Sequence, residues 1–124
     1  MRILLFLFLL FPIANTGDMD AIVKAIANGQ VGILEQYLDS TVEVSLPDKE
    51  DIVEKEEAIS LLKAFFEKNA PRGFGEIHQG ASRGNDSIYY IGNLLTNSGN
   101  YRMYLFIHLN NGRPIIQEIR INKA

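Results

Sequence analysis

His78 has the most adaptable chemistry in this sequence, because the pKa of an imidazole lies near neutral pH. If residues 84–86 form a three-residue turn, His78 falls opposite Gly92, on the core side of a sheet beside Tyr90 and Met103. There it could act as a general base, and His78, Tyr90 and Met103 could bind a small ligand. The simpler alternative, which we favour, is a histidine that satisfies a buried backbone carbonyl, since buried polar groups need hydrogen-bond partners.

Four residues near the end of the chain form a second candidate site. Arg102 and Tyr104 lie at alternate positions of one predicted strand, and Glu118 and Arg120 at alternate positions of the next. Such a charge network could recognise a carboxylate or a sugar. A cross-strand ion pair at an interface between two copies of the chain is more ordinary, because opposite charges often face each other in antiparallel sheets. We therefore predict an interface role for these four residues.

The composition argues against several kinds of chemistry. Cysteine is absent, so the chain has no thiol nucleophile and no thiolate metal site. His78 and His108 fall on predicted strands that lie about 10 Å apart, whereas first-row metal ligands lie about 2 Å from one centre. The formal net charge of -3 disfavours a nucleic-acid partner, which requires concentrated Lys and Arg. We predict no metal, no cofactor and no nucleic acid.

The N-terminal segment has the order of residues that is typical of a secretory signal peptide. Arg2 is followed by an unbroken apolar run over residues 3–11 and then by small or polar residues at 14–17. The apolar run is shorter than the roughly 20 residues that cross a bilayer. We expect removal of residues 1–17 and export to the periplasm or out of the cell, with no membrane span in the mature chain. Residues 18–124 then form a single domain.

The spacing of apolar residues predicts the elements that position these side chains. Helices are expected over residues 18–28, 31–38 and 56–69. Alternation predicts a pair of strands over residues 41–46 and 51–55. Between Asn- and Gly-rich turns, four further strands are expected over residues 74–82, 87–96, 100–109 and 114–122. Helices followed by an antiparallel meander indicate an α+β fold.

The turns predict which side of the meander each residue faces. A two-residue turn at Ser98-Gly99 and a three-residue turn at 111–113 place Leu105 opposite Gly92 and Ile119. The core face then carries Tyr90, Met103, Leu105, Ile107, Ile119 and Ile121. The outer, mixed face carries Asn93, Arg102, Tyr104, Phe106, Glu118 and Arg120. Residues 103–107 are apolar on both sides while helices cover one side, so we predict that the mixed face packs against a second copy.

Five short stretches carry a resemblance to a known family, and they comprise residues 42–47, 65–66 with 69–71, 77–80, 101–104 and 116–120. Over nearly the whole mature chain, the sequence resembles a family of small exported bacterial proteins of unknown function with a nuclear-transport-factor-like, cystatin-like fold. The resemblance implies a cone, in which a curved antiparallel sheet wraps the long helix and leaves a pocket at its open end. It implies no known activity, and a fold alone does not specify one.

Two functions are compatible with these observations. The first is an exported, non-catalytic domain that binds a small apolar ligand or an envelope protein through its cone or its outer sheet face. The second is suggested by isomerase and dehydratase relatives of the same fold, with His78 as general base, Tyr90 as hydrogen-bond donor and Glu76 as a second acid. An open cavity lined by His78, Tyr90 and a carboxylate would favour the enzyme. A cone filled by Phe65, Phe66, Met103 and Leu105 would favour binding at the surface or a purely structural role.

Overall fold

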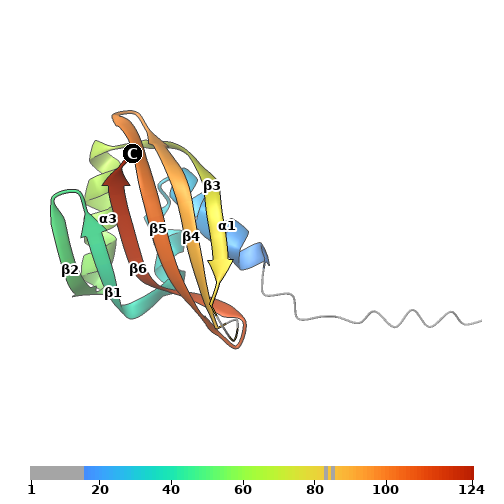
Figure 1. Cartoon of the computed structure of the whole chain (residues 1–124). Coiled ribbons are helices and arrows are strands. Elements are labelled where there is room, and N and C mark those ends of the chain that lie inside the picture. The colour runs from blue at the N-terminus through green and yellow to red at the C-terminus, as the bar shows by residue number, and fades with distance from the viewer. Residues whose placement is uncertain (1–15, 83, 85) are drawn as a thin grey trace, which may run out of the picture.

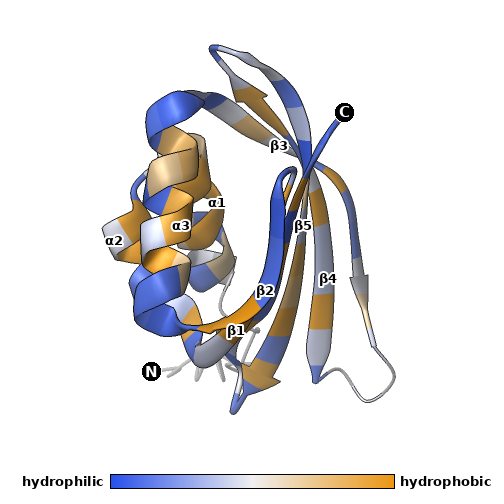
Figure 2. Ribbon diagram, turned by 90° about the vertical axis from the view of Figure 1, so that its left-hand side faces the viewer, coloured by the Kyte–Doolittle hydropathy of each residue, from blue (hydrophilic) through white to orange (hydrophobic). Residues whose placement is uncertain are grey.

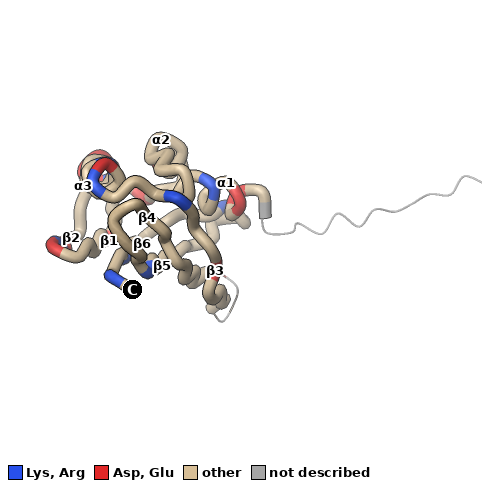
Figure 3. Tube along the Cα trace, turned by 90° about the horizontal axis from the view of Figure 1, so that it is seen from above, with Lys and Arg blue, Asp and Glu red and all other residues tan. Residues whose placement is uncertain are grey.

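Helices form a layer on one face of a six-stranded sheet in the computed structural model, which describes residues 16–82, 84 and 86–124 (Figure 1, Figure 2, Figure 3). Residues 1–15 of the predicted signal peptide and Asn85 of the predicted turn lie outside the described residues. Within this part of the chain, no helix is long and apolar enough to cross a membrane. The α+β class predicted from the sequence is confirmed.

The first helix, α1, spans Thr16–Ala27 and buries Ile22, Ala25 and Ile26. It ends where Gly29 adopts a φ of +67°. The amide of Gly29 donates to the carbonyl of Ile26 at 3.2 Å, and the amide of Gln30 donates to that of Ala25 at 2.8 Å. These two bonds form a Schellman motif, which requires a left-handed residue at the Gly29 position. The helix predicted over residues 18–28 is confirmed.

The second predicted helix is shorter than expected. Helix α2 covers only Val31–Leu34, and a 3-10 turn covers Glu35–Tyr37. Leu38, which the helical spacing assigned to the same helix, begins strand β1 (Leu38–Leu46) and pairs with Ile116. Pairing with a distant strand therefore outweighs the local four-residue spacing of apolar side chains.

The long helix predicted over residues 56–69 is α3, which spans Lys55–Lys68. Its buried side chains form a single stripe and are Ala58, Leu62, Phe65 and Phe66. The helix ends at Asn69, where the backbone amide and the side-chain Nδ2 both donate to the carbonyl of Phe65, at 2.9 and 3.0 Å. One asparagine thus caps a carbonyl that the helix leaves free.

The strands form one sheet in the order β2-β1-β6-β5-β4-β3. After β1 they span Lys49–Glu54 (β2), Pro71–Ala81 (β3), Ser87–Thr96 (β4), Gly99–Asn110 (β5) and Arg113–Lys123 (β6). The predicted strand pair β1–β2 and the four-stranded meander β3 to β6 are confirmed, and within the pair and within the meander neighbouring strands are antiparallel. Strand β1 joins the meander in parallel beside β6, so the whole sheet is mixed rather than purely antiparallel.

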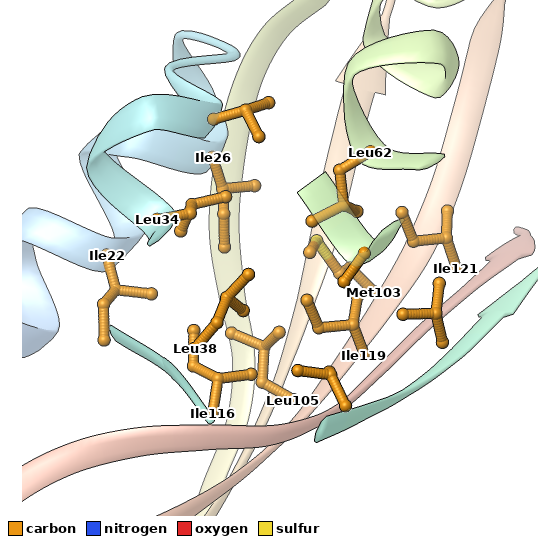
Figure 4. Packing of buried hydrophobic residues seen from close by; sticks show 14 of the residues in the cluster. Ile22, Ile26, Leu34, Leu38, Leu62, Met103, Leu105, Ile116, Ile119 and Ile121 are labelled. Atoms are coloured by element: carbon orange, nitrogen blue, oxygen red, sulfur yellow. The ribbon is translucent and has the colours of Figure 1, made fainter. Parts of the chain in front are cut away.

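The two faces of β4, β5 and β6 are those that alternation predicted. The inner face is buried and carries Tyr90, Met103, Leu105, Ile107, Ile119 and Ile121. Figure 4 shows Met103 and Ile119 of this face lying close to Leu62 of α3. Phe65, Phe66, Met103 and Leu105 are all buried in the same cluster. The interior of the cone is therefore filled by side chains, which is the outcome that favours binding at the surface or a purely structural role.

The register between β4 and β5 differs from the predicted one. Thr96 pairs with Gly99, which puts Leu105 opposite Tyr90 instead of Gly92. The difference is two residues, and because side chains alternate with a period of two, both arrangements keep Leu105 on the inner face.

The turn between β5 and β6 has two residues, not the three predicted. Asn111 and Gly112 adopt φ values of +53° and +80°, as a type I′ hairpin turn requires. A bulge at Gln117 then adds one residue to β6. The bulge restores the register that the longer turn had predicted, so Leu105 does lie opposite Ile119.

Candidate functional site

His78 lies on the outer face of the sheet, not on the core face. A register shift in β3 leaves Ile77 as an extra residue, so Glu76 pairs with Gly92 while His78 pairs with Ile91. Ile91 is in the row of outer-face residues, and His78 beside it is exposed. The predicted position of His78 opposite Gly92 is therefore wrong. The bulge shifts the pairing of the following β3 residues by one position, so their side chains point to the opposite faces of the sheet.

The predicted ligand-binding residues do not come together. Tyr90 and Met103 lie on the inner face and are 5% and 0% exposed, so His78 is separated from both by the sheet itself. Burial raises the pKa of Tyr90, and the carboxylates of Glu76 and Asp20 raise it further. Tyr90 therefore faces acidic groups of β3 and α1 and keeps its proton. A base at His78 and a donor at Tyr90 cannot line one cavity.

The outer face carries three neighbouring aromatic rings, which we term the outer aromatic cluster: Tyr89, Tyr104 and Phe106. The ring centroids of Tyr89 and Phe106 are 5.1 Å apart with an interplanar angle of 55°, and those of Tyr89 and Tyr104 are 6.1 Å apart at 41°. Tyr89 is 38% exposed, and the other two rings are half-buried. Aromatic rings grouped on an uncovered face are typical of interaction surfaces.

An ion pair lies beside the outer aromatic cluster. Arg120 Nε donates to the carboxylate of Glu118, and this bond raises the pKa of Arg120. Burial, followed by the charge of Glu118 and by Tyr89, raises the pKa of Tyr104. The cluster, the ion pair and Asn122 line a hollow of about 580 Å³.

Three of the four predicted interface residues thus lie together at this hollow, namely Tyr104, Glu118 and Arg120. Arg102 is on the same face but lies one pair further along β5, between Asn93 and Asn122. The role of the four residues at an interface stays a prediction.

A second hollow, which the sequence analysis missed, lies between the β1–β2 hairpin and α3. These two elements run side by side at one end of the molecule (Figure 1, Figure 3). The hollow measures about 350 Å³. We term it the hairpin groove, defined by its apolar lining and two lysines: Leu46, Leu61, Phe65, Tyr101, Lys49 and Lys68. These residues are far apart in the sequence, so no local motif predicts that they line one hollow.

Asn69 fixes the floor of the hairpin groove. Its Oδ1 accepts hydrogen bonds from the hydroxyl of Tyr101, at 3.1 Å, and from the hydroxyl of Ser98. Its Nδ2 donates to the carbonyl of Phe65. The ring of Phe65 meets that of Tyr101 edge to face, with centroids 5.2 Å apart and an interplanar angle of 81°. The floor is therefore held rigidly by one buried aromatic pair and one polar hub.

Known proteins resemble this arrangement over most of the chain. A solved DUF4783 family protein from Bacteroides ovatus is 30% identical, and the match covers 84% of this chain and 93% of that chain with a TM-score of 0.78. A second, from Bacteroides fragilis, is 32% identical over 84% of this chain and 96% of that chain, with a TM-score of 0.76. A comparison with curated proteins finds no match.

More distant structures share the fold alone. An NTF2-like protein from Cytophaga hutchinsonii is 18% identical, covers 87% of this chain and 93% of that chain, and has a TM-score of 0.63. This confirms the nuclear-transport-factor-like fold. The family described as "Domain of unknown function (DUF4783)" matches residues 19–122. The chain therefore belongs to the DUF4783 family, a family of unknown function, and has an NTF2-like fold.

Proposed function

We propose that this chain is an exported, non-catalytic module that binds a protein partner through the outer face of its sheet, and that the partner is a second copy of itself. The single observation that carries the proposal is the outer aromatic cluster. It lies on the outer face of the sheet, and Figure 2 shows the helices packed on the other face. Burial of such rings is a main source of free energy in protein association. The filled interior of the cone leaves the surface as the place for binding.

The charges on the outer face support a second copy over an envelope protein of strongly acidic or basic character. Glu118 and Arg120 place one acceptor and one donor side by side, so the pair is neutral. When two such faces stack about a two-fold axis, Arg120 of one copy can meet Glu118 of the other. The Glu118–Arg120 pair can therefore complement the same pair of a second copy.

The size of the face also suits a dimer. Four strands about 4.8 Å apart and about 30 Å long span roughly 600 Å² before side-chain relief is counted. Each partner of a stable complex buries about 800 Å². Sheets that pack face to face lie about 10 Å apart with interdigitating side chains, and Tyr104 and Phe106 are the large side chains of β5 on this face.

The non-catalytic part of the proposal rests on the separation of His78 from Tyr90. An isomerase or dehydratase needs a base and a hydrogen-bond donor that converge on one substrate. His78 and Tyr90 point to opposite faces of the sheet, which removes the pair that suggested this chemistry.

Sedimentation velocity at micromolar concentration tests the proposal. We expect a dimeric mass for the parent protein and a monomeric mass for Tyr104→Glu, which brings like charges together with Glu118 across the two-fold axis. Ile33→Glu is the matched control, because Ile33 is a partly exposed apolar residue on the helical side. Circular dichroism checks that each variant is folded. A parent protein that stays monomeric would contradict the proposal.

A further inference from the structure

We propose that the hairpin groove binds a small amphipathic carboxylate, with its apolar part on the rings of Phe65 and Tyr101 and its carboxylate at Lys68. This site lies between the β1–β2 hairpin and α3, away from the outer sheet face. It is therefore independent of the self-association proposed above, and each proposal can fail without the other.

The groove has the size of a small-molecule site. Its volume of about 350 Å³ falls within the range of roughly 300–1,000 Å³ that is usual for ligand pockets. A closed apolar cavity of about 150 Å³ already holds a benzene molecule. The hairpin groove thus has room for an aromatic ring or a medium-length alkyl chain together with a polar head.

The floor of the groove suits an apolar group. Phe65 and Tyr101 line the groove, each is 7% exposed, and their rings meet edge to face. Leu46 and Leu61 form its sides. An alkyl chain or ring placed there removes apolar surface from water, at about 25 cal/mol per Å² buried.

The floor is also prepared for binding in advance. The Oδ1 of Asn69 accepts from Tyr101 and Ser98, and its Nδ2 donates to Phe65. The rings therefore need no rearrangement when a ligand arrives, which avoids an ordering cost. The carbonyl of Phe65 at the end of α3 accepts hydrogen bonds from Asn69 Nδ2 and from the Asn69 backbone amide. Its partial negative charge is therefore already engaged and repels a bound carboxylate less.

The charges at the rim select the head group. Lys49 Nζ lies 3.9 Å from the carboxylate of Glu57, so part of its charge is already balanced. Lys68, in the last turn of α3, has no ion-pair partner within the described residues. A carboxylate at the rim pairs with Lys68 and is attracted by Lys49, so two lysines oppose the single carboxylate of Asp48 at the hairpin tip. An ammonium head group meets two lysines and is disfavoured.

Amide NMR titrations of the full chain with octanoate, octanol and octylamine test the proposal. We expect octanoate to shift the amides of residues 46–49 and 64–69 and to saturate, with weaker binding of octanol and none of octylamine. Equal binding of octanoate and octanol, or shifts confined to the outer sheet face, would overturn it.

Variants of α3 separate the head group from the tail. Lys68→Glu should weaken octanoate binding about 10-fold, since it both removes and reverses a charge, and should leave octanol unchanged. Lys63→Glu makes the same charge change on the same helix outside the groove, and should keep octanoate affinity within about twofold. Ala64→Phe fills the groove and should abolish binding of both ligands; if it does not fold, the Lys68 and Lys63 variants decide. Octanoate affinity equal in the two charge variants would overturn the proposal.

Discussion

Gly92 of β4 lies directly against the ring of Phe74 of β3. A Cβ atom at Gly92 would come within 2.5 Å of Phe74 Cζ and 2.9 Å of the carbonyl oxygen of Gly75. The ring has little room to withdraw, because it packs on Tyr90 with centroids 5.6 Å apart. We predict that Gly92→Ala lowers the free energy of unfolding by about 2–3 kcal/mol, measured by urea denaturation, as overpacking of a closed site does.

Two variants show whether the Phe74 ring is the cause. In a Phe74→Leu background, Gly92→Ala should cost at least about 1 kcal/mol less, because the ring that it strikes has gone. Gly73→Ala on β3 is the control, since a Cβ there meets only Leu95 Cδ1, at an ordinary 3.8 Å. Equal losses for the alanine variants of Gly92 and Gly73 would show that the close approach does not matter.

Asn69 is the second position at which a single side chain holds several segments together. Asn69→Ala removes the acceptor of Tyr101 and Ser98 and the second cap of the Phe65 carbonyl. We predict a loss of about 2 kcal/mol in the free energy of unfolding, because partly buried groups lose their partners. Asn28→Ala provides the comparison, as Asn28 Nδ2 makes one exposed bond to the Lys24 carbonyl, 2.9 Å long. The free energy of unfolding of Asn28→Ala should fall by less than about 0.5 kcal/mol. Equal losses for the two variants would contradict the role of Asn69 in joining several segments.

The faces of the meander could be predicted from the sequence because a side-chain period of two tolerates errors of even size. Leu105 pairs with Tyr90 and not with Gly92, yet it faces inward in either register. Tyr104 and Phe106 flank Leu105 in β5, so both face outward. Alternation therefore predicted the inner-face residues of β4 to β6, and Tyr104 and Phe106 of the outer face, correctly despite two wrong turns, whereas Tyr89 was not among the predicted residues.

Ile77 shows what local pattern does not reveal. One extra residue in β3 moved His78 to the opposite face, and its residue type does not distinguish a bulge from a regular strand position.

The hairpin groove escaped prediction for a related reason. Lys49, Lys68 and Tyr101 line one hollow because β1 pairs in parallel with β6 and so brings the β1–β2 hairpin beside α3. Such meetings depend on packing between distant segments, which neighbouring residues do not encode.

The raised pKa of Tyr90 predicts a loss of stability in alkaline solution. Burial and the nearby carboxylates keep its proton on in the folded protein, whereas the unfolded chain releases it near pH 10. This stabilisation is therefore complete below pH 10 and is lost as pH rises through the folded pKa. Urea denaturation of the parent and of Tyr90→Phe at pH 8 to 11 measures it. The stability advantage of the parent should be constant up to about pH 9 and shrink above pH 10; a constant difference throughout would exclude this linkage.

The N-terminal segment predicts export, and cleavage near residue 17 is compatible with the folded domain. Cleavage there keeps Asp18, whose carboxylate accepts a hydrogen bond from the hydroxyl of Tyr37 at 3.2 Å. In a bacterial host, we expect the protein in the periplasmic fraction, with mass spectrometry showing loss of about 17 residues. Leu7→Arg breaks the apolar run and should leave the full-length chain in the cytosol, whereas Leu7→Ile keeps the run and should be exported. Full-length protein in the periplasm, or export of the arginine variant, would show that residues 1–17 are not a cleaved signal.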